Sequence, residues 1–303
     1  GRQKLNKAKA EAALDRLARK LGLDVIQTAM GAFKIVNSHM ADLVRKVSIE
    51  RGYDPRHFVL FSFGGAGPTH CPFFGRELGV KSVYIPNYSS VFSALGMLTG
   101  GIVHSLQMSY PARFPLSEEG IGNINRIYRR MKDSLSEQFT REGIDAGKVT
   151  FSSYAYMKYR LQATELPVLL GDTEIRPDNQ EAIVKVFEEK YAGVYGKDTG
   201  YPEAGIEILK YRMDGFFDTP VPQIARELSK APPDPSLALK GKRRAYFETP
   251  GDFLETPVYD SLKLRYGHVL KGPVIVERMG DTVVLPPDTV GYVDEYLNIK
   301  IEL

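Results

Sequence analysis

The sequence predicts an α/β fold in the first third of the chain, followed by an α+β region and a small β-rich module at the C-terminal end. Three observations support this prediction. Apolar runs alternate with helical patterns between residues 58 and 99, a charged helical pattern precedes a strand-like run between residues 117 and 170, and the tail from residue 242 is rich in strand-forming residues. Strands and helices that alternate at this spacing indicate a layer with at least partly parallel strands.

Two helices are expected before this layer. Alanine, leucine and charged residues recur at helical spacing from Lys7 to Leu21, and the stretch from Gly22 to Asp24 supplies a helix stop and a new cap. From Val25 to Ile49 the apolar residues step by three and four, which predicts one continuous stripe packed against a core. The members of this stripe are Ile26, Ala29, Met30, Phe33, Val36, Met40, Leu43, Val44 and Val47.

The α/β layer is expected to begin with an apolar strand from Phe58 to Phe63. A glycine-rich turn and a helix from about Thr69 to Leu78 follow, and a second strand runs from Ser82 to Ile85. Another helix is expected to begin near Val91.

Beyond the layer, the pattern predicts a charged helix from Ser117 to Gly143, an extended run from Val149 to Leu170, a helix from Pro177 to Tyr195 and a strand from Ile206 to Phe217. Prolines and polar residues without apolar periodicity mark a connector between Thr219 and Gly241. The predicted domains are therefore 1–115, 116–218 and 242–303, with a linker over 219–241.

Composition excludes several classes of protein. The net charge of the 303 residues is only +3 with both signs interspersed, so neither nucleic acid nor an anionic membrane is an expected partner. No apolar run approaches the roughly 20 residues that span a bilayer, and no signal peptide is recognisable at the start.

Cys71 is the single cysteine, which excludes an internal disulfide and suits a reducing, cytoplasmic compartment. The first residue is Gly1 rather than Met, which suggests a processed chain or a fragment.

The most informative stretch is "LFSFGGAGPTHCPFFGRELG", Leu60 to Gly79. A strand that ends in consecutive glycines and continues into a helix directs several backbone N–H groups to one point, where the helix dipole adds partial positive charge. Gly64, Gly65 and Gly67 have no Cβ and can adopt positive φ, so a ligand can approach the backbone. Such a turn suits an anion such as a nucleotide phosphate, although turns of this kind also serve packing alone. The spacing is that of neither a Rossmann nor a Walker motif.

Several ordered motifs resemble the hydantoinase A/5-oxoprolinase family. "FGGAGPTH" begins at Phe63, and "RELGV", "VYIP" and "VFSALGML" follow it, while "MADLVRKVSIERGYDPRHFVL" precedes it. Further along stand "YRLQATEL" from Tyr159, "RRAYF" from Arg243, "TPVYD" from Thr256 and "KGPVIVERMGDTVVLPPD" from Lys271. The resemblance extends over nearly the whole chain.

This resemblance implies half of an actin-like ATPase fold in the first domain, with ATP and Mg²⁺ or another divalent metal as cofactors. Members of the family begin with an Asp-x-Gly-Gly-Thr phosphate loop that this sequence lacks, so the chain resembles the second half of the ATPase region plus a C-terminal domain. A hydantoinase B type subunit is implied as the partner in a hetero-oligomer. Three positions depart from the family pattern, namely Thr69, Cys71 and Leu161, the last of which stands where the family commonly has glycine.

Eight residues are the candidates for the site. Gly64, Gly65, Ala66 and Gly67 are expected to line the nucleotide, and His70, Ser93, Gln162 and Glu165 are the candidate catalytic residues; the metal ligands are unknown. Each catalytic candidate has a structural alternative. For His70 it is a hydrogen bond to the backbone of the turn, and for Ser93 it is a helix cap. For Gln162 and Glu165 it is a surface pair, because strand alternation places these two on opposite faces unless the strand bulges or ends.

Other candidates have less support. Cys71 is expected to be a small buried residue rather than a nucleophile. Asp214, Glu277 and Asp281 have no local support as ligands, and the other histidines have no metal-binding spacing.

Three functions follow from these expectations. The first is ATP-dependent activation of the carbonyl oxygen of a cyclic amide, such as hydantoin or 5-oxoproline, by phosphorylation for ring-opening hydrolysis. The second is a subunit of an ATP-dependent ketone carboxylase of the acetone or acetophenone type. The third is a non-catalytic assembly module of a heteromeric complex.

Overall fold

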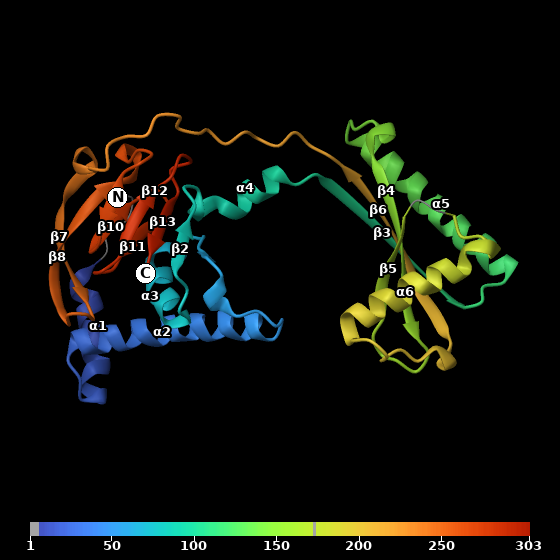
Figure 1. Ribbon diagram of the computed structural model, residues 1–303, viewed down its shortest axis with the longest axis horizontal. Coiled ribbons are helices and arrows are strands. Elements are labelled where there is room, and N and C mark those ends of the chain that lie inside the picture. Colours follow the sequence, from blue (N-terminus) through green and yellow to red (C-terminus); the bar gives the residue numbers. More distant parts are fainter. Residues whose placement is uncertain (1–5, 172–173) are drawn as a thin grey trace. The chain divides into compact units, whose positions relative to one another are not determined.

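The computed structural model describes residues 6–171 and 174–303 of the chain. The chain forms two compact units (Figure 1). The first combines Gly1–Met97 with Gln223–Leu303, and the second is the continuous segment Leu98–Pro222.

The first unit contains two sheets and the helices of the N-terminal region. Its helices are α1 (Lys7–Leu21), α2 (Val25–Ile49) and α3 (Gly67–Leu78), and α4 (Phe92–Thr99) begins in it. Its strands are β1 (Leu60–Phe61), β2 (Ser82–Ile85), β7 (Leu239–Phe247), β8 (Asp252–Asp260), β9 (Val269–Lys271), β10 (Val274–Glu277), β11 (Thr282–Leu285), β12 (Val290–Val293) and β13 (Ile299–Glu302). One sheet has the order β1-β2-β13-β12-β9 and the other β11-β10-β8-β7.

The parallel pair that the sequence predicts is β1 and β2. They are joined through α3, so the strand, glycine turn, helix and second strand form one βαβ unit. The strand predicted from Phe58 to Phe63 is shorter, because only Leu60 and Phe61 pair with β2. The predicted bounds of α1, α2 and β2 are confirmed.

The first two helices begin and end on local signals. The Asn6 side chain accepts a hydrogen bond from the backbone N–H of Lys9 at the start of α1, and Gly22 ends that helix in the left-handed conformation. Asp24 and Gln27 form a capping box at the start of α2.

The C-terminal strands do not form the separate module over 242–303 that the sequence predicts. β13 lies between β2 and β12, and Ile301 stands opposite Val83 of β2. Apolar residues of α3, β2 and β10 to β13 belong to one buried cluster. A four-residue strand such as β13 buries only two apolar side chains on its inner face, so it depends on a larger sheet to bury them.

The apolar stripe of α2 packs only in part. Ala41 is fully buried, and Met40 and Val44 lie against the same cluster. In contrast, Leu43 is 63% exposed and Val47 is 42% exposed. The apolar residues predicted to form one continuous stripe therefore lie on two faces of α2, and only one of these faces packs on the core of this unit.

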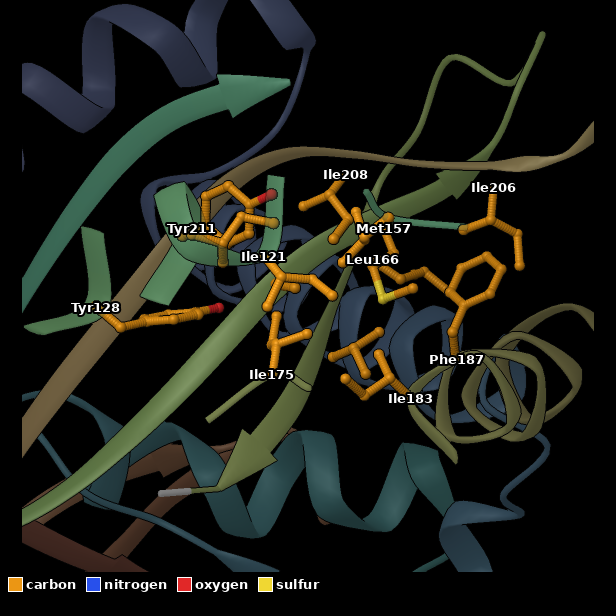
Figure 2. Packing of buried hydrophobic residues seen from close by; sticks show 14 of the residues in the cluster. Ile121, Tyr128, Met157, Leu166, Ile175, Ile183, Phe187, Ile206, Ile208 and Tyr211 are labelled. Carbon is orange, nitrogen blue, oxygen red and sulfur yellow. The ribbon is translucent and has the colours of Figure 1, made fainter. Parts of the chain in front are cut away.

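The second unit is an antiparallel sheet with two helices. Its strands are β3 (Ile102–Arg113), β4 (Thr150–Tyr159), β5 (Leu166–Gly171) and β6 (Ile206–Phe217), and its helices are α5 (Glu118–Arg141) and α6 (Gln180–Tyr195). The strand order is β3-β6-β4-β5, and buried residues of both helices pack with inward residues of the strands (Figure 2). The unit begins before the predicted boundary at residue 116, because β3 pairs along β6.

The extended run predicted from Val149 to Leu170 is a hairpin of two strands. β4 ends at Tyr159 and β5 begins at Leu166, so alternation stops between them. In the predicted connector, β7 already begins at Leu239. No helix among residues 6–171 and 174–303 has the length and apolar character needed to cross a bilayer.

Candidate functional site

The glycine turn lies between β1 and the start of α3. Gly64 has φ +90°, a conformation that favours glycine, and its backbone N–H donates to the carbonyl oxygen of Ser89 at 2.7 Å. A Cβ on Gly67 would lie 3.0 Å from the hydroxyl oxygen of Ser62, so this glycine permits a close approach within the turn. Gly65 is different, since a Cβ there would meet only the carbonyl oxygen of Gly280, at 3.6 Å.

The N–H groups of this turn are available to a ligand. Within the part of the chain that the structure describes, the backbone N–H groups of Gly65, Ala66 and Gly67 donate no hydrogen bond to the protein. Gly65 and Ala66 are exposed, and Pro68 stands in the first turn of α3, where its missing N–H costs little. The turn is therefore open to solvent and carries the partial positive charge of a helix N-terminus.

His70 lies in the first turns of α3, but its ring faces α2. It stacks on Phe33 with ring centroids 4.9 Å apart, and its Nδ1 lies 3.3 Å from Oδ1 of Asn37. Burial lowers the pKa of His70 below its ordinary value, which favours the neutral ring. Phe33 and Asn37 also line a groove of about 460 Å³ between α2, α3 and the β7–β8 turn. The His70 ring therefore contacts the neighbouring helix α2 rather than the backbone of the glycine turn.

Ser93 does not stand at the beginning of its helical segment. A 3-10 turn over Ser89–Val91 precedes α4, so Ser93 lies one turn further along and is exposed. Within the described residues its hydroxyl makes no capping hydrogen bond. Ser89, which the sequence does not single out, is the serine that contacts the glycine turn.

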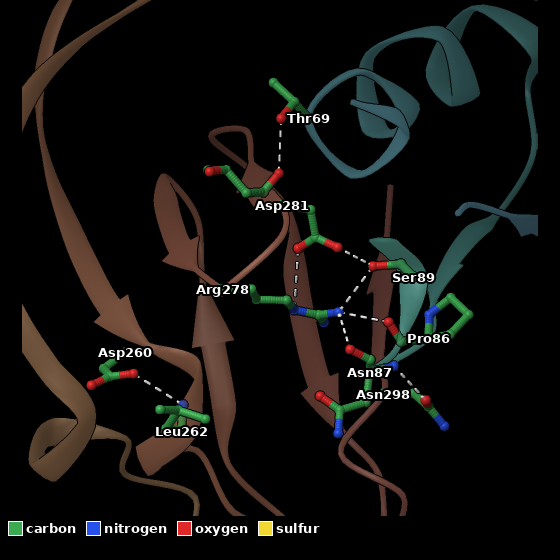
Figure 3. A network of polar contacts seen from close by, with 10 residues as sticks. Thr69, Pro86, Asn87, Ser89, Asp260, Leu262, Arg278, Asp281 and Asn298 are labelled. Carbon is green, nitrogen blue, oxygen red and sulfur yellow. Dashed lines mark hydrogen bonds and ion pairs between the residues drawn. The ribbon is translucent and has the colours of Figure 1, made fainter. Parts of the chain in front are cut away.

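A buried polar network lies beside the turn and was not predicted (Figure 3). Arg278 and Asp281 belong to the turn between β10 and β11, and their side chains are 5% and 1% exposed. Nη1 of Arg278 donates to the carbonyl oxygen of Pro86 at 2.6 Å and to that of Asn87 at 3.3 Å, and the Ser89 hydroxyl donates to Asp281. The sequence offered one signal for it, the "VERMGD" segment within the family motif, but no spacing that connects residue 281 with residue 89.

Gln162 and Glu165 lie in the second unit, in the turn between β4 and β5. The Gln162 side chain donates to the hydroxyl of Tyr191 in α6, whereas Glu165 forms an ion pair with Lys210 of β6. The two side chains therefore have different partners. Leu161 precedes them with φ 72° and is 92% exposed.

Two further expectations concern cysteine and metal. Cys71 is fully buried, as expected, and burial raises the pKa of its thiol to about 12, so the thiolate is not available at neutral pH. Among the described residues, no three or more His, Cys, Asp or Glu side chains come together as a metal-binding group.

Comparison with known proteins places these features in a family. A family model described as Hydantoinase/oxoprolinase matches residues 1–105, and one described as Hydantoinase/oxoprolinase C-terminal domain matches residues 117–302. The chain is 33% identical over 305 residues to an uncharacterized protein of Methanocaldococcus jannaschii, covering 100% of this chain and 42% of that protein. It is 28% identical to the acetone carboxylase beta subunit of Xanthobacter autotrophicus, covering 94% of this chain and 41% of that subunit. The chain thus spans about two fifths of the length of these curated relatives.

Solved structures agree with the fold. A nucleotide-free structure of acetone carboxylase is similar over 99% of this chain and 43% of the chain in that structure, with a TM-score of 0.84 and 25% sequence identity. The structure of an ATP-dependent caprolactamase from Pseudomonas jessenii is similar over 98% of this chain and 43% of the chain in that structure, with a TM-score of 0.69 and 23% sequence identity. This second similarity supports the fold alone. The glycine turn, the ordered motifs around it and the matches along both units make this chain a member of the hydantoinase/oxoprolinase family.

Proposed function

We propose that this chain is the C-terminal part of an ATP-dependent subunit that activates the carbonyl oxygen of a cyclic amide, such as hydantoin or 5-oxoproline, for ring-opening hydrolysis. In this proposal the first unit supplies one half of an actin-like ATPase fold. The observation that carries the proposal is the open glycine turn, in which three consecutive backbone N–H groups have no acceptor among the described residues.

The residues of the turn fit a nucleotide phosphate. Gly65, Ala66 and Gly67 offer unpaired N–H donors at the start of a helix, where an anion is stabilised by the helix dipole. The absence of a side chain at Gly65 lets a phosphate oxygen reach the backbone. ATP would supply the phosphoryl group that turns the carbonyl oxygen of the substrate into a leaving group.

The other candidate residues have more limited parts in this proposal. His70 is neutral and is held against α2, so it would support the first turns of α3. Ser93 is exposed and can reach a ligand without losing a capping bond. Gln162 and Glu165 would have to exchange their bonds with Tyr191 and Lys210 for bonds to a substrate.

Two further components are proposed from the family. Mg²⁺ or another divalent cation would accompany ATP, with phosphate oxygens among its ligands. A hydantoinase B type subunit would supply the surface on which water attacks the activated carbon. The relative named as the acetone carboxylase beta subunit supports a hetero-oligomer.

A ketone carboxylase is the second candidate function. It is favoured by the acetone carboxylase structure, which matches with the higher TM-score of 0.84, against 0.69 for the caprolactamase. Activation of a carbonyl oxygen by ATP is common to both candidates, which differ in what the activated carbon then reacts with. A panel of 5-oxoproline, hydantoin, N-methylhydantoin, acetone and acetophenone, with bicarbonate added for the ketones, distinguishes them by the substrate that releases phosphate from ATP.

The glycine turn is tested with Gly65→Val in the complete subunit, which would contain the other half of the proposed ATPase fold. Because a Cβ at this position makes only an ordinary contact, the variant should keep the stability of the wild type. Its branched side chain would cover the N–H groups, so we expect ATP to bind at least about tenfold more weakly, or roughly 1.4 kcal/mol, by calorimetry. Gly241→Val, at a position in β7 with no atom within 4 Å of a Cβ, is the matched control. Equal affinity in the two variants would remove the turn from the mechanism.

A further inference from the structure

The turn between β10 and β11 contacts the glycine turn and the loop between β2 and α4. The carbonyl oxygen of Gly280 lies 3.6 Å from the Cβ position of Gly65, and a Cβ on Gly280 would lie 2.4 Å from the hydroxyl oxygen of Ser90. Beside it, Nη1 of Arg278 donates to the carbonyl oxygens of Pro86 and Asn87 and to the hydroxyl of Ser89. One guanidinium group therefore contacts three residues of the segment between β2 and α4 (Figure 3).

Ser89 connects this network with the glycine turn. Its hydroxyl donates to Asp281, and its carbonyl oxygen accepts the N–H of Gly64 at 2.7 Å. Gly64 is the residue with φ +90°, so the hydrogen bond holds the backbone at the point where it turns. The position of Ser89 thus fixes the direction of the N–H groups that follow.

The buried pair is a costly way to stabilise a fold. Nε of Arg278 lies 3.7 Å from Oδ1 of Asp281, which is too far for a hydrogen bond, and neither of these atoms nor Nη2 of Arg278 has a hydrogen-bond partner among the described residues. Desolvation of two charges commonly exceeds their mutual attraction, and apolar residues of similar size often stabilise a protein as well or better. Stability alone therefore does not explain an arginine and an aspartate at these positions.

We propose that Arg278 and Asp281 are positioning residues that hold the glycine turn, through Ser89, in the conformation that binds the nucleotide. This inference rests on the proposed nucleotide-binding function of the turn. Arg278 holds the loop by donating hydrogen bonds to the carbonyl oxygens of Pro86 and Asn87. Asp281 accepts the Ser89 hydroxyl and so fixes its orientation, and the Ser89 carbonyl oxygen accepts the N–H of Gly64.

The test is the double variant Arg278→Met with Asp281→Leu in the full chain. It removes both charges together, so that no single charge is left buried, and we expect it to fold. The local readout is hydrogen exchange at the Gly64 amide, compared with that at the Ile301 amide of the central strand β13. We expect faster exchange at Gly64 and an unchanged rate at Ile301, together with ATP affinity lowered by about tenfold or more.

Control variants separate this effect from a general loss of stability. Lys240→Met with Glu277→Gln removes an ion pair between β7 and β10 of the same sheet that is 57% and 35% exposed and does not contact Ser89, so it should change neither readout. If the double variant does not fold, Arg278→Lys keeps the positive charge, but the lysine nitrogen ends one bond short of the position of Nη1, the atom that donates to Pro86 and Asn87, and this variant should change both readouts in the same direction.

The outcomes distinguish this inference from the proposed function. Wild-type exchange at Gly64 in the folding variant would overturn the inference, whatever the affinity for ATP. If the complete wild-type subunit, of which this chain is proposed to be the C-terminal part, did not bind ATP in combination with its partner subunit, the proposed function would fail, while faster exchange at Gly64 would still support the positioning role.

Discussion

Leu161 has a backbone conformation that L side chains rarely adopt. Its φ is 72°, and its side chain is 92% exposed, so no packing compensates for the strain. The family resemblance implies glycine at this position. The structure gives a physical reason for glycine, because the turn between β4 and β5 has a positive φ at residue 161.

Leu161→Gly should therefore stabilise the protein. Relief of the strained φ exceeds the extra entropy that glycine gives to the unfolded chain, and we expect a gain of roughly 0.5–1 kcal/mol in the free energy of unfolding. Urea denaturation of the full chain measures it. Leu161→Ala keeps the strain and should lie within about 0.5 kcal/mol of the wild type. A glycine variant no more stable than the alanine variant would contradict this explanation.

His70 should make stability depend on pH. Its pKa is lowered by burial in the folded state, whereas the unfolded chain has the ordinary value of about 6.5. As pH falls below that value the unfolded state takes up a proton before the folded state does, so stability decreases until the pH is below the folded pKa. Above pH 7 both states are neutral and this contribution is complete.

The measurement compares the wild type with His70→Gln by urea denaturation at pH 7.5, 6.5 and 5.5. The stability of the wild type relative to the variant should decrease as the pH falls, because glutamine does not titrate. His39→Gln, which changes an exposed histidine of α2, controls for the loss of a histidine as such. A difference that stays constant with pH, or increases on acidification, would rule out a neutral His70.

At the scale of elements, α2 has two apolar faces with different roles. Ala41 is fully buried on the face that packs on the core, and Leu43 on the other face is 63% exposed. Replacement of Ala41 by leucine would insert extra atoms into a packed core and should destabilise the first unit by about 1–3 kcal/mol. Leu43→Lys should change stability by less than about 0.5 kcal/mol in the same thermal or urea unfolding experiment. If both variants were equally destabilised, the two faces would not differ as described.

Much of this architecture could be predicted from periodicity. The bounds of α1, α2 and β6 agree with the predicted ranges, because caps, stripe and alternation are local signals. β3 was not predicted, although its inward residues Leu106, Met108, Tyr110 and Ala112 alternate as a strand requires. The sequence did not show which strand pairs with β3, since its partner β6 lies about a hundred residues later in the chain.

The candidate site was predictable to a similar extent. The glycine turn could be read from sequence because its chemistry depends on consecutive residues. Arg278, Asp281 and Ser89 could not, because their proximity results from β13 pairing with β2 in one sheet and from the packing of the second sheet on the same core. Alternation does not apply to Gln162 and Glu165, because β4 ends at Tyr159 and both residues lie in the hairpin turn, where each has its own partner.

At the scale of the molecule, the two units differ in how the chain contributes to them. The first is assembled from both ends of the sequence, and the second is continuous from Leu98 to Pro222. The second unit also has its own core, to which α5, α6 and all four strands contribute, and Figure 2 shows residues of α5, α6, β4, β5 and β6 in it. Continuity and a complete core are the conditions under which a segment folds alone.

The fragment 98–222 should therefore fold by itself, whereas 242–303 should not. The first contains every strand of its sheet; the second lacks β1 and β2, so β13 would lose the partner opposite Val83 and expose the apolar residues that pack on α3. A chain of about 60 residues is marginal even with a complete core. We expect a single cooperative urea transition, followed by circular dichroism, for 98–222 and none for 242–303. Cooperative unfolding of 242–303 would restore the separate C-terminal module, and the network that ties Arg278 to Ser89 would then join two independent domains rather than two parts of one.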